Sequence, residues 1–221
     1  METKTAKKTT KKDYGKLIVD AFVEQVLETG NQPTSIFKFA QSLKMKEGDF
    51  YAYFTSFEAI KSAILLQIFE EARLQLESQE VFKEYSAREK FLGFLFTWVE
   101  VLKTKRSYLL SVYGQSSKII TSFPSEFREF RKKFKEFAAD IILEGKETQE
   151  IANRPFISDR YDEALWLQVL FVFKYWLEDH SPRFEKTDAA IEKSVNLAFD
   201  LMGQSALDSF LDFAKFMYQN K

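Results

Sequence analysis

Residues 34–60 read TSIFKFAQSLKMKEGDFYAYFTSFEAI, and this stretch decides how the N-terminal part of the chain folds. Its apolar residues recur at helical spacing as far as Leu43, which predicts a short helix. Thr34 or Ser35 stands where the N-cap of that helix belongs. Residues 44–46 then make a tight turn. The stretch therefore begins with a short capped helix and a sharp change of direction.

A second short helix is expected over residues 47–53, with Phe50 facing inward. Thr55 and Glu58 have the spacing of a capping box, so a long helix should begin there. Two short helices across a tight turn form the frame of a helix-turn-helix, a motif that places its second helix in the major groove of DNA. The local pattern therefore indicates a nucleic-acid-binding module.

The composition favours an all-α fold over the whole chain. Of 221 residues, 45% are hydrophobic and 24 are phenylalanine, while there are only 7 glycines and 4 prolines. Few helix breakers and many periodic apolar residues indicate helices throughout. We expect an arm over residues 1–13, a helix-turn-helix domain over 14–60 and a larger helical bundle over 61–221.

The net charge of −1 is unevenly distributed. Residues 1–16 contain six lysines against two acidic residues, a net charge of +4, so the remainder carries −5. Such an arm can lie along DNA phosphates or act only as a solubilising tail. The candidate phosphate-binding residues in it are Lys7, Lys8, Lys11 and Lys12.

Neither a signal peptide nor a membrane span is expected. The first residues lack an apolar core segment. The longest apolar stretches, residues 91–102 and 164–173, are shorter than the roughly 20 residues that a span needs. We therefore expect a soluble, cytoplasmic protein.

No constellation in the sequence supports catalysis, a cofactor or a metal. The absence of cysteine excludes disulfides, thiolate catalysis and Cys-ligated zinc. The single histidine, His180, follows two acidic residues at a helix end and is expected on the surface. We find no phosphate-binding loop and no nucleophile elbow. The chain is therefore expected not to be an enzyme.

The C-terminal part has a row of phenylalanines along one predicted helix, residues 123–145, at alternating steps of four and three. The row is either solid core or one wall of an apolar ligand cavity between this helix and those at 86–104 and 158–179. The candidate lining residues are Trp98, Tyr113, Phe130, Phe134, Phe137, Trp166 and Phe173, with Tyr113 and Gln168 available to orient a polar head group.

The predicted helix at 158–179 is apolar around much of its circumference, so one neighbour cannot cover it. A two-fold homodimer built from this helix and residues 188–217 would bury the excess surface. The candidate contacts are Phe173, Phe210 and Phe213, although each can also pack within its own chain.

The first ~60 residues resemble the DNA-binding domain of TetR-type (TetR/AcrR-like) transcriptional regulators. The residues that match in uninterrupted register are Thr34, Ser35, Ile36, Phe39, Ala40, Met45, Gly48, Phe50, Tyr51, Tyr53, Phe54, Ser56, Glu58 and Ile60. The resemblance implies a C-terminal helical domain that binds a ligand and dimerises through its last two helices. The expected partners are double-stranded DNA, a hydrophobic small molecule and a second copy of the chain.

Five residues depart from the family pattern near the DNA: Phe37, Lys44, Glu47, Asp49 and Phe57. A carboxylate repels phosphates, and each lost cation removes a counterion-release contribution. A carboxylate can instead accept a hydrogen bond from cytosine N4, so Glu47 or Asp49 is a candidate base reader. The other candidate DNA contacts are Lys38, Lys44, Lys46, Tyr51 and Tyr53, with Lys46 and the two tyrosines on phosphates.

Two functions remain open at this stage. The first is a DNA-binding transcriptional regulator, a repressor that responds to a hydrophobic ligand. The alternative is a protein of the same fold that binds a lipid or another hydrophobic ligand and has lost DNA recognition.

Overall fold

The computed structural model describes residues 14–114, 124–154, 157–203, 213 and 216–219, and these residues contain helices and no strand. The all-α prediction is therefore confirmed. The chain divides into two compact units, residues 1–60 and residues 61–221. Helix α4 (Phe57–Glu77) begins in the first unit and continues in the second.

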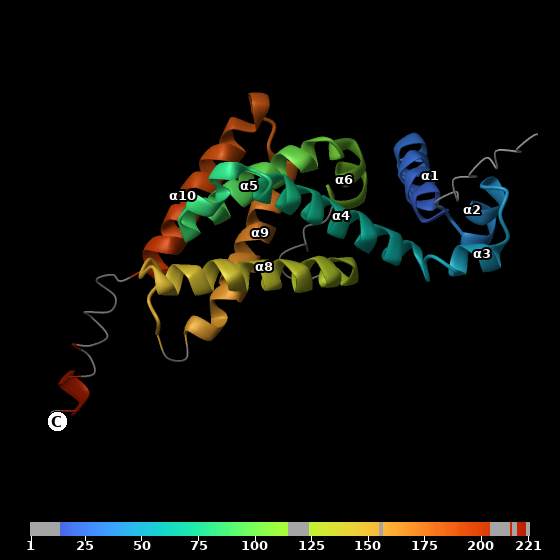
Figure 1. The fold of residues 1–221 in the computed structure, drawn as a ribbon. Helices are drawn as coiled ribbons and strands as arrows, with labels where there is room; N and C mark the ends of the chain where they lie inside the picture. Colours follow the sequence, from blue (N-terminus) through green and yellow to red (C-terminus); the bar gives the residue numbers. More distant parts are fainter. Residues whose placement is uncertain (1–13, 115–123, 155–156, 204–212, 214–215, 220–221) are drawn as a thin grey trace, which may run out of the picture. The chain divides into compact units, whose positions relative to one another are not determined.

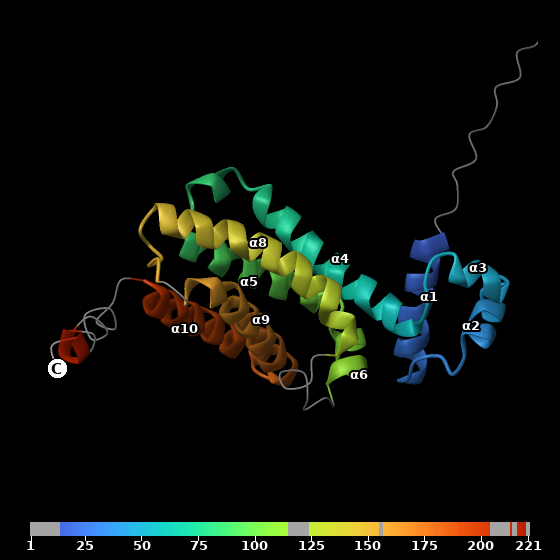
Figure 2. The ribbon, with the colours of Figure 1, turned by 90° about the horizontal axis from the view of Figure 1, so that it is seen from below.

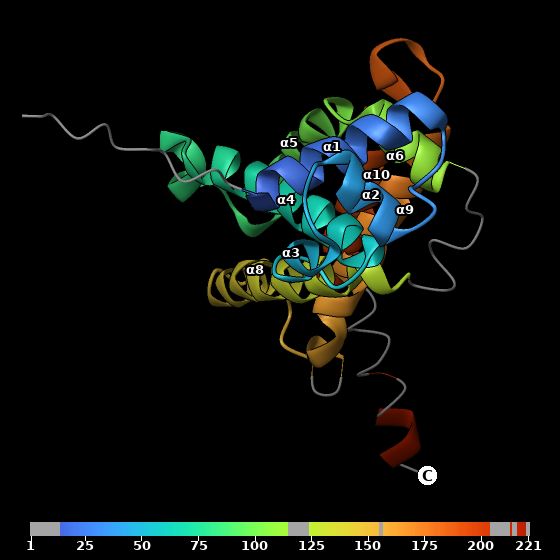
Figure 3. The same ribbon diagram turned by 90° about the vertical axis from the view of Figure 1, so that its right-hand side faces the viewer.

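The first unit contains three helices and the start of α4, and Figures 1 and 3 show it from two sides. The helices are α1 (Tyr14–Thr29), α2 (Ile36–Ser42) and α3 (Glu47–Tyr51). They enclose a small apolar core whose fully or nearly fully buried members are Ile18, Phe22, Val26, Phe39, Ala40, Phe50, Phe57 and Ile60.

Two boundaries in this unit differ from the sequence prediction. Helix α3 ends at Tyr51 rather than at residue 53, because the backbone N–H groups of Tyr53 and Phe54 both bond to the carbonyl of Phe50 and close a turn. Helix α4 is capped by Ser56 rather than Thr55, since the Ser56 hydroxyl accepts a hydrogen bond from the Ala59 N–H at 3.2 Å.

The second unit is a bundle in which α5 (Ala87–Lys103) packs against α8 (Arg128–Glu147) and α10 (Glu185–Met202), and α9 (Tyr161–Glu178) packs against the same two helices. Figure 2 shows α9 and α10 lying side by side. The remaining elements are α6 (Arg106–Tyr113) and the short 3-10 turns η1 (Glu80–Glu84), η2 (Ser125–Phe127), η3 (Ser158–Arg160) and η4 (Pro182–Phe184).

The ends of α9 and α10 also differ from expectation. Helix α9 begins at Tyr161 after one 3-10 turn, because the Ser158 hydroxyl is used as an acceptor for the Arg154 N–H at 2.7 Å and does not cap the helix. The last predicted helical region was residues 188–219 with a bend near Gly203. In the structure α10 ends at Met202 with Gly203 as its C-cap, and residues 216–219 are helical again. Residue Phe210 lies outside the described residues.

Candidate functional site

The helix-turn-helix frame is complete in the first unit. The Ser35 hydroxyl accepts a hydrogen bond from the Lys38 N–H at 3.2 Å, so Ser35 is the N-cap of α2. At the turn, Lys44 has a left-handed backbone with φ of 57°. This conformation costs a residue with a side chain about 1–2 kcal/mol, a cost that glycine does not have. The turn fixes the direction in which α3 leaves α2.

The predicted DNA-contacting side chains within residues 14–60 are all accessible. Lys38 and Lys44 are exposed on α2 and its turn, and α3 exposes Lys46 and Asp49 while Phe50 is buried. The two tyrosines that follow, Tyr51 and Tyr53, are 49% and 48% exposed. Lys7, Lys8, Lys11 and Lys12 lie outside the described residues. Helix α3 and the residues beside it therefore present the ammonium of Lys46, the carboxylates of Glu47 and Asp49 and two tyrosine hydroxyls to a partner.

The two carboxylates of α3 have different local partners. A carboxylate oxygen of Asp49 accepts the backbone N–H of Lys46 at 3.1 Å and so caps the helix. Glu47 accepts a hydrogen bond from the Tyr51 hydroxyl at 3.3 Å. Partial desolvation and the charge of Glu47 raise the pKa of Tyr51, which keeps its hydroxyl a donor. Because that hydrogen is directed to Glu47, Tyr51 is less suited to a phosphate than the sequence suggested.

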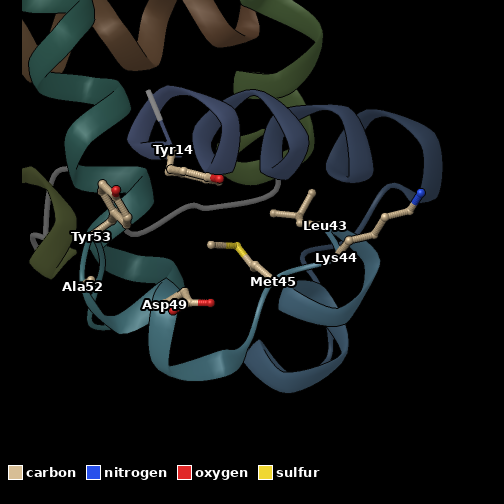
Figure 4. A pocket seen from close by; sticks show the side chains of 7 residues that line it. All are labelled: Tyr14, Leu43, Lys44, Met45, Asp49, Ala52 and Tyr53. Carbon is tan, nitrogen blue, oxygen red and sulfur yellow. The ribbon is translucent and has the colours of Figure 1, made fainter. Parts of the chain in front are cut away.

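A groove of about 500 Å³ lies beside α3 (Figure 4). Its lining residues come from the start of α1, from the turn and from α3: Tyr14, Leu43, Lys44, Met45, Asp49, Ala52 and Tyr53. The rings of Tyr14 and Tyr53 are 6.1 Å apart at its edge. Asp49 belongs to this groove, whereas Glu47 does not line it.

Two phenylalanines that replace the family's cationic residues have opposite environments. Phe57 is only 8% exposed and stacks on Phe22 with ring centroids 5.6 Å apart. It also meets the rings of Phe39 and Phe50 edge-on. Phe37, by contrast, is 59% exposed. Phe57 is therefore a core residue of this unit, and its departure from the family pattern strengthens the core at the expense of a surface charge.

The second unit brings the predicted ligand-binding residues together in one aromatic core. Phe130 lies between two indole rings, with centroids 5.6 Å from Trp98 and 5.0 Å from Trp166. The cluster continues through Phe134, which contacts Trp166 at 5.6 Å. Every other predicted lining residue is also buried: Tyr113, Phe137, Gln168 and Phe173. The indole N–H groups of Trp98 and Trp166 have no hydrogen-bond partner within the described part of the chain.

One end of this core is polar, a feature that the sequence pattern did not reveal. Tyr108 and Tyr113 face Glu126, which is 8% exposed and lies 3.8 Å from Lys61. Burial, reinforced by the Glu126 carboxylate, raises the pKa of both tyrosines. The predicted head-group anchor Gln168 points elsewhere, since its amide donates to the Ser194 hydroxyl on α10 at 3.0 Å.

The candidate dimer contacts need a correction. Phe173 is fully buried within its own chain, where its ring lies 5.9 Å from Trp98 and 5.8 Å from Tyr113. It therefore cannot meet a second copy. Phe213 is 61% exposed. The large apolar side chains that α9 and α10 leave at the surface are Leu167, Phe171, Leu197 and Leu201.

Other kinds of site find little support in the described residues. No group of histidine, aspartate and glutamate side chains among them is arranged to hold a metal ion. His180 is exposed, as expected. No helix in the described ranges is long and apolar enough to cross a membrane.

A helix-turn-helix unit followed by a helical bundle defines a class of transcriptional regulators, and the comparisons with known proteins agree. Residues 90–217 match the family model for the tetracyclin repressor-like C-terminal domain. Since this match spans more than half of the sequence, the chain belongs to the TetR family of transcriptional regulators. No curated protein sequence matches it.

Similar solved structures share the fold. A protein assigned to the tetR family of transcription regulators from Shewanella sp. PV-4 has 18% identity and a TM-score of 0.56, covering 85% of this chain and 97% of that one. A protein of unknown function from Rhodococcus sp. RHA1 has 14% identity and a TM-score of 0.58, covering 90% and 100%. A tetR family regulatory protein from Rhodococcus RHA1 has 18% identity and a TM-score of 0.51, covering 87% and 98%.

Proposed function

We propose that this chain is a cytoplasmic, DNA-binding repressor of the TetR type whose binding responds to a hydrophobic small molecule. The observation that carries the proposal is the complete helix-turn-helix frame, in which α2 is capped, the turn at Lys44 is closed and α3 is anchored by Phe50 with its polar side chains outward.

In this proposal two copies of α3, one from each subunit, enter successive major grooves about one helical turn apart. Lys46 and Tyr53 hold phosphates, supported by Lys38 and Lys44. The arm, residues 1–13, adds cationic contacts through Lys7, Lys8, Lys11 and Lys12. Residues 14–60 are the DNA-binding domain, and residues 61–221 bind the ligand and dimerise.

The ligand is assigned to the aromatic core of the second unit. Ligand sites of this kind are mostly apolar with a few polar anchors. Here the indole N–H groups of Trp98 and Trp166, which have no hydrogen-bond partner among the described residues, and the hydroxyl of Tyr113 beside Glu126 are the candidate polar anchors. A ligand that separates these rings would change the packing of α5 against α8.

The dimer is assigned to the exposed apolar face of α9 and α10. Leu167 and Phe171 are one helical turn apart on α9, as are Leu197 and Leu201 on α10, so each pair lies on one side of its helix. A two-fold axis beside this face would bury the same four side chains of both copies.

The test is a mobility-shift titration of the full-length dimer on the DNA upstream of its own gene, at two salt concentrations. We expect a shift that weakens with salt, because each phosphate contact contributes roughly −0.9 to the slope of log affinity against log salt. Deletion of residues 1–12 should flatten the slope. Asp49→Thr keeps an acceptor for the Lys46 N–H but removes a charge, so non-specific binding should tighten.

Absence of any shift on genomic DNA at low salt would refute the proposed function. The protein would then be a ligand-binding member of the fold without DNA recognition. Thermal-shift assays with hydrophobic compounds test the ligand part separately, since a solid core would give no stabilisation with any of them.

A further inference from the structure

The short helix α3 presents two different polar faces. Glu47 and Tyr51 are four residues apart and lie on one face, joined by the 3.3 Å hydrogen bond. Asp49 lies on the face that lines the groove in Figure 4, together with Tyr53 beyond the end of the helix. Phe50 fills the third side and is fully buried. The two carboxylates therefore point to different surroundings.

Asp49 is already committed within the protein. Its carboxylate accepts the Lys46 N–H at 3.1 Å, which satisfies one of the free donors at the start of the helix. If Asp49 turned away from Lys46 towards a base, it would lose this bond and leave the helix end uncapped, at a cost of about 1 kcal/mol. Asp49 is therefore explained by the structure of α3 itself.

Glu47 has no such structural task. One of its carboxylate oxygens accepts the Tyr51 hydroxyl, and in the described part of the chain no hydrogen bond reaches the other oxygen. The bond to Tyr51 restrains the side chain without consuming its accepting capacity, because a carboxylate has about four lone-pair positions. Glu47 is thus a partly exposed, oriented acceptor at the first position of α3.

Gly48, next to Glu47, indicates that a partner approaches closely at this point. Its φ is not positive, and a Cβ built on it would have no heavy atom within 4 Å. Neither its backbone nor the packing of the described residues therefore needs a glycine here, although a glycine within a helix costs roughly 0.5–1 kcal/mol relative to alanine. A missing side chain does allow another molecule to come close to the backbone.

We propose that Glu47, oriented by Tyr51, reads a cytosine in each half-site of the operator by accepting a hydrogen bond from its N4 amino group. The proposal rests on the proposed function, in which α3 enters the major groove. A carboxylate is repelled by phosphates and by the acceptors of guanine and thymine. Adenine offers an amino donor but places the N7 acceptor beside it, whereas cytosine offers the amino donor alone. Cytosine is therefore the base edge that suits Glu47.

The experiment is selection of binding sites from a randomised double-stranded DNA library by the full-length protein, followed by affinity measurements on the enriched sites. The wild type should enrich sites with a fixed cytosine in each half-site, and replacing that C·G pair should weaken binding at least five-fold. Glu47→Gln should move the preference at this position to adenine, because an amide can both accept from N6 and donate to N7.

Two further variants separate the roles of the neighbouring side chains. Tyr51→Phe removes the orienting hydroxyl and should reduce the ratio of affinities for the cytosine and substituted sites while the preference persists. Asp49→Asn is the matched control, since its amide oxygen can still cap α3, and it should leave the preferred base unchanged. Circular dichroism of each variant checks that the helices remain folded.

The outcomes distinguish this inference from the proposed function. Enriched sites without a fixed cytosine, or a cytosine preference that Glu47→Gln leaves intact, would overturn the role of Glu47 and leave DNA binding standing. If Asp49→Asn loses the preference for cytosine, Asp49 is the base-reading residue, and the proposed role of Glu47 is wrong. If no site is enriched at low salt, the proposed function fails and the role of Glu47 fails with it.

Discussion

Replacing Phe57 should destabilise the first unit, even when the replacement restores the lysine common in the family. The ring is 8% exposed and contacts three other phenylalanines: Phe22, Phe39 and Phe50. Truncation of a buried phenylalanine to alanine costs about 3–5 kcal/mol. Taking 3 kcal/mol, the population of the opened unit rises roughly 150-fold. Phe57→Lys should cost a similar amount, because its ammonium must leave the core to be solvated.

Hydrogen exchange measured by mass spectrometry is the suitable assay. The three tryptophans, Trp98, Trp166 and Trp176, all lie in residues 61–221, so their fluorescence does not report directly on the first unit. We expect protection of peptides within residues 14–60 to fall about 100-fold or more in Phe57→Ala.

The same unit supplies a matched control. Phe37 is the same residue type at 59% exposure, and Phe37→Ala should change protection by less than about 0.5 kcal/mol. Equal losses in the Phe37 and Phe57 variants would refute the reasoning. So would a Phe57→Lys variant that stays folded and binds DNA more tightly, since that result would place residue 57 on the DNA-facing surface.

Three further predictions address other parts of the fold. Lys44→Gly should raise the free energy of unfolding by about 0.5–1 kcal/mol by relieving the left-handed backbone, and a lowered denaturation midpoint would contradict this. At Asp179, burial raises the carboxyl pKa, but hydrogen bonds from Ser181 and Thr187 outweigh it and hold the pKa well below its usual value. The ionised Asp179 carboxylate therefore stabilises the folded state at pH values above its unfolded pKa of about 4, and this stabilisation is lost as the pH falls through the lower, folded pKa. The difference in Tm between wild type and Asp179→Asn should be constant near neutrality and should become smaller below about pH 4. Phe171→Glu should convert the dimer to a monomer in light scattering, and an unchanged dimer mass would exclude the proposed face of α9.

The sequence by itself determined the helices and the helix-turn-helix frame. Periodicity and capping are local properties, so the cap at Ser35 and the phenylalanine row of α8 can be read from residues a few positions apart, and the structure contains them. At the start of α4 the capping-box pattern predicted Thr55 as the cap, whereas the structure uses Ser56. The choice between two adjacent cap residues shifts the helix start by one position, and the packing of the flanking segments decides it.

Only the tertiary structure decided which side chains are free to act. Phe37 and Phe57 are the same residue in the same short unit, and their environments differ because α1 covers one and not the other. Glu47 and Asp49 are likewise two carboxylates on one turn of helix. They differ because Asp49 accepts the Lys46 N–H, whereas Glu47 accepts the Tyr51 hydroxyl. The pairing of Tyr113 with Glu126 and the burial of Phe173 join residues from different helices. Burial and hydrogen bonding between distant segments arise only when the helices pack, so one sequence cannot assign them.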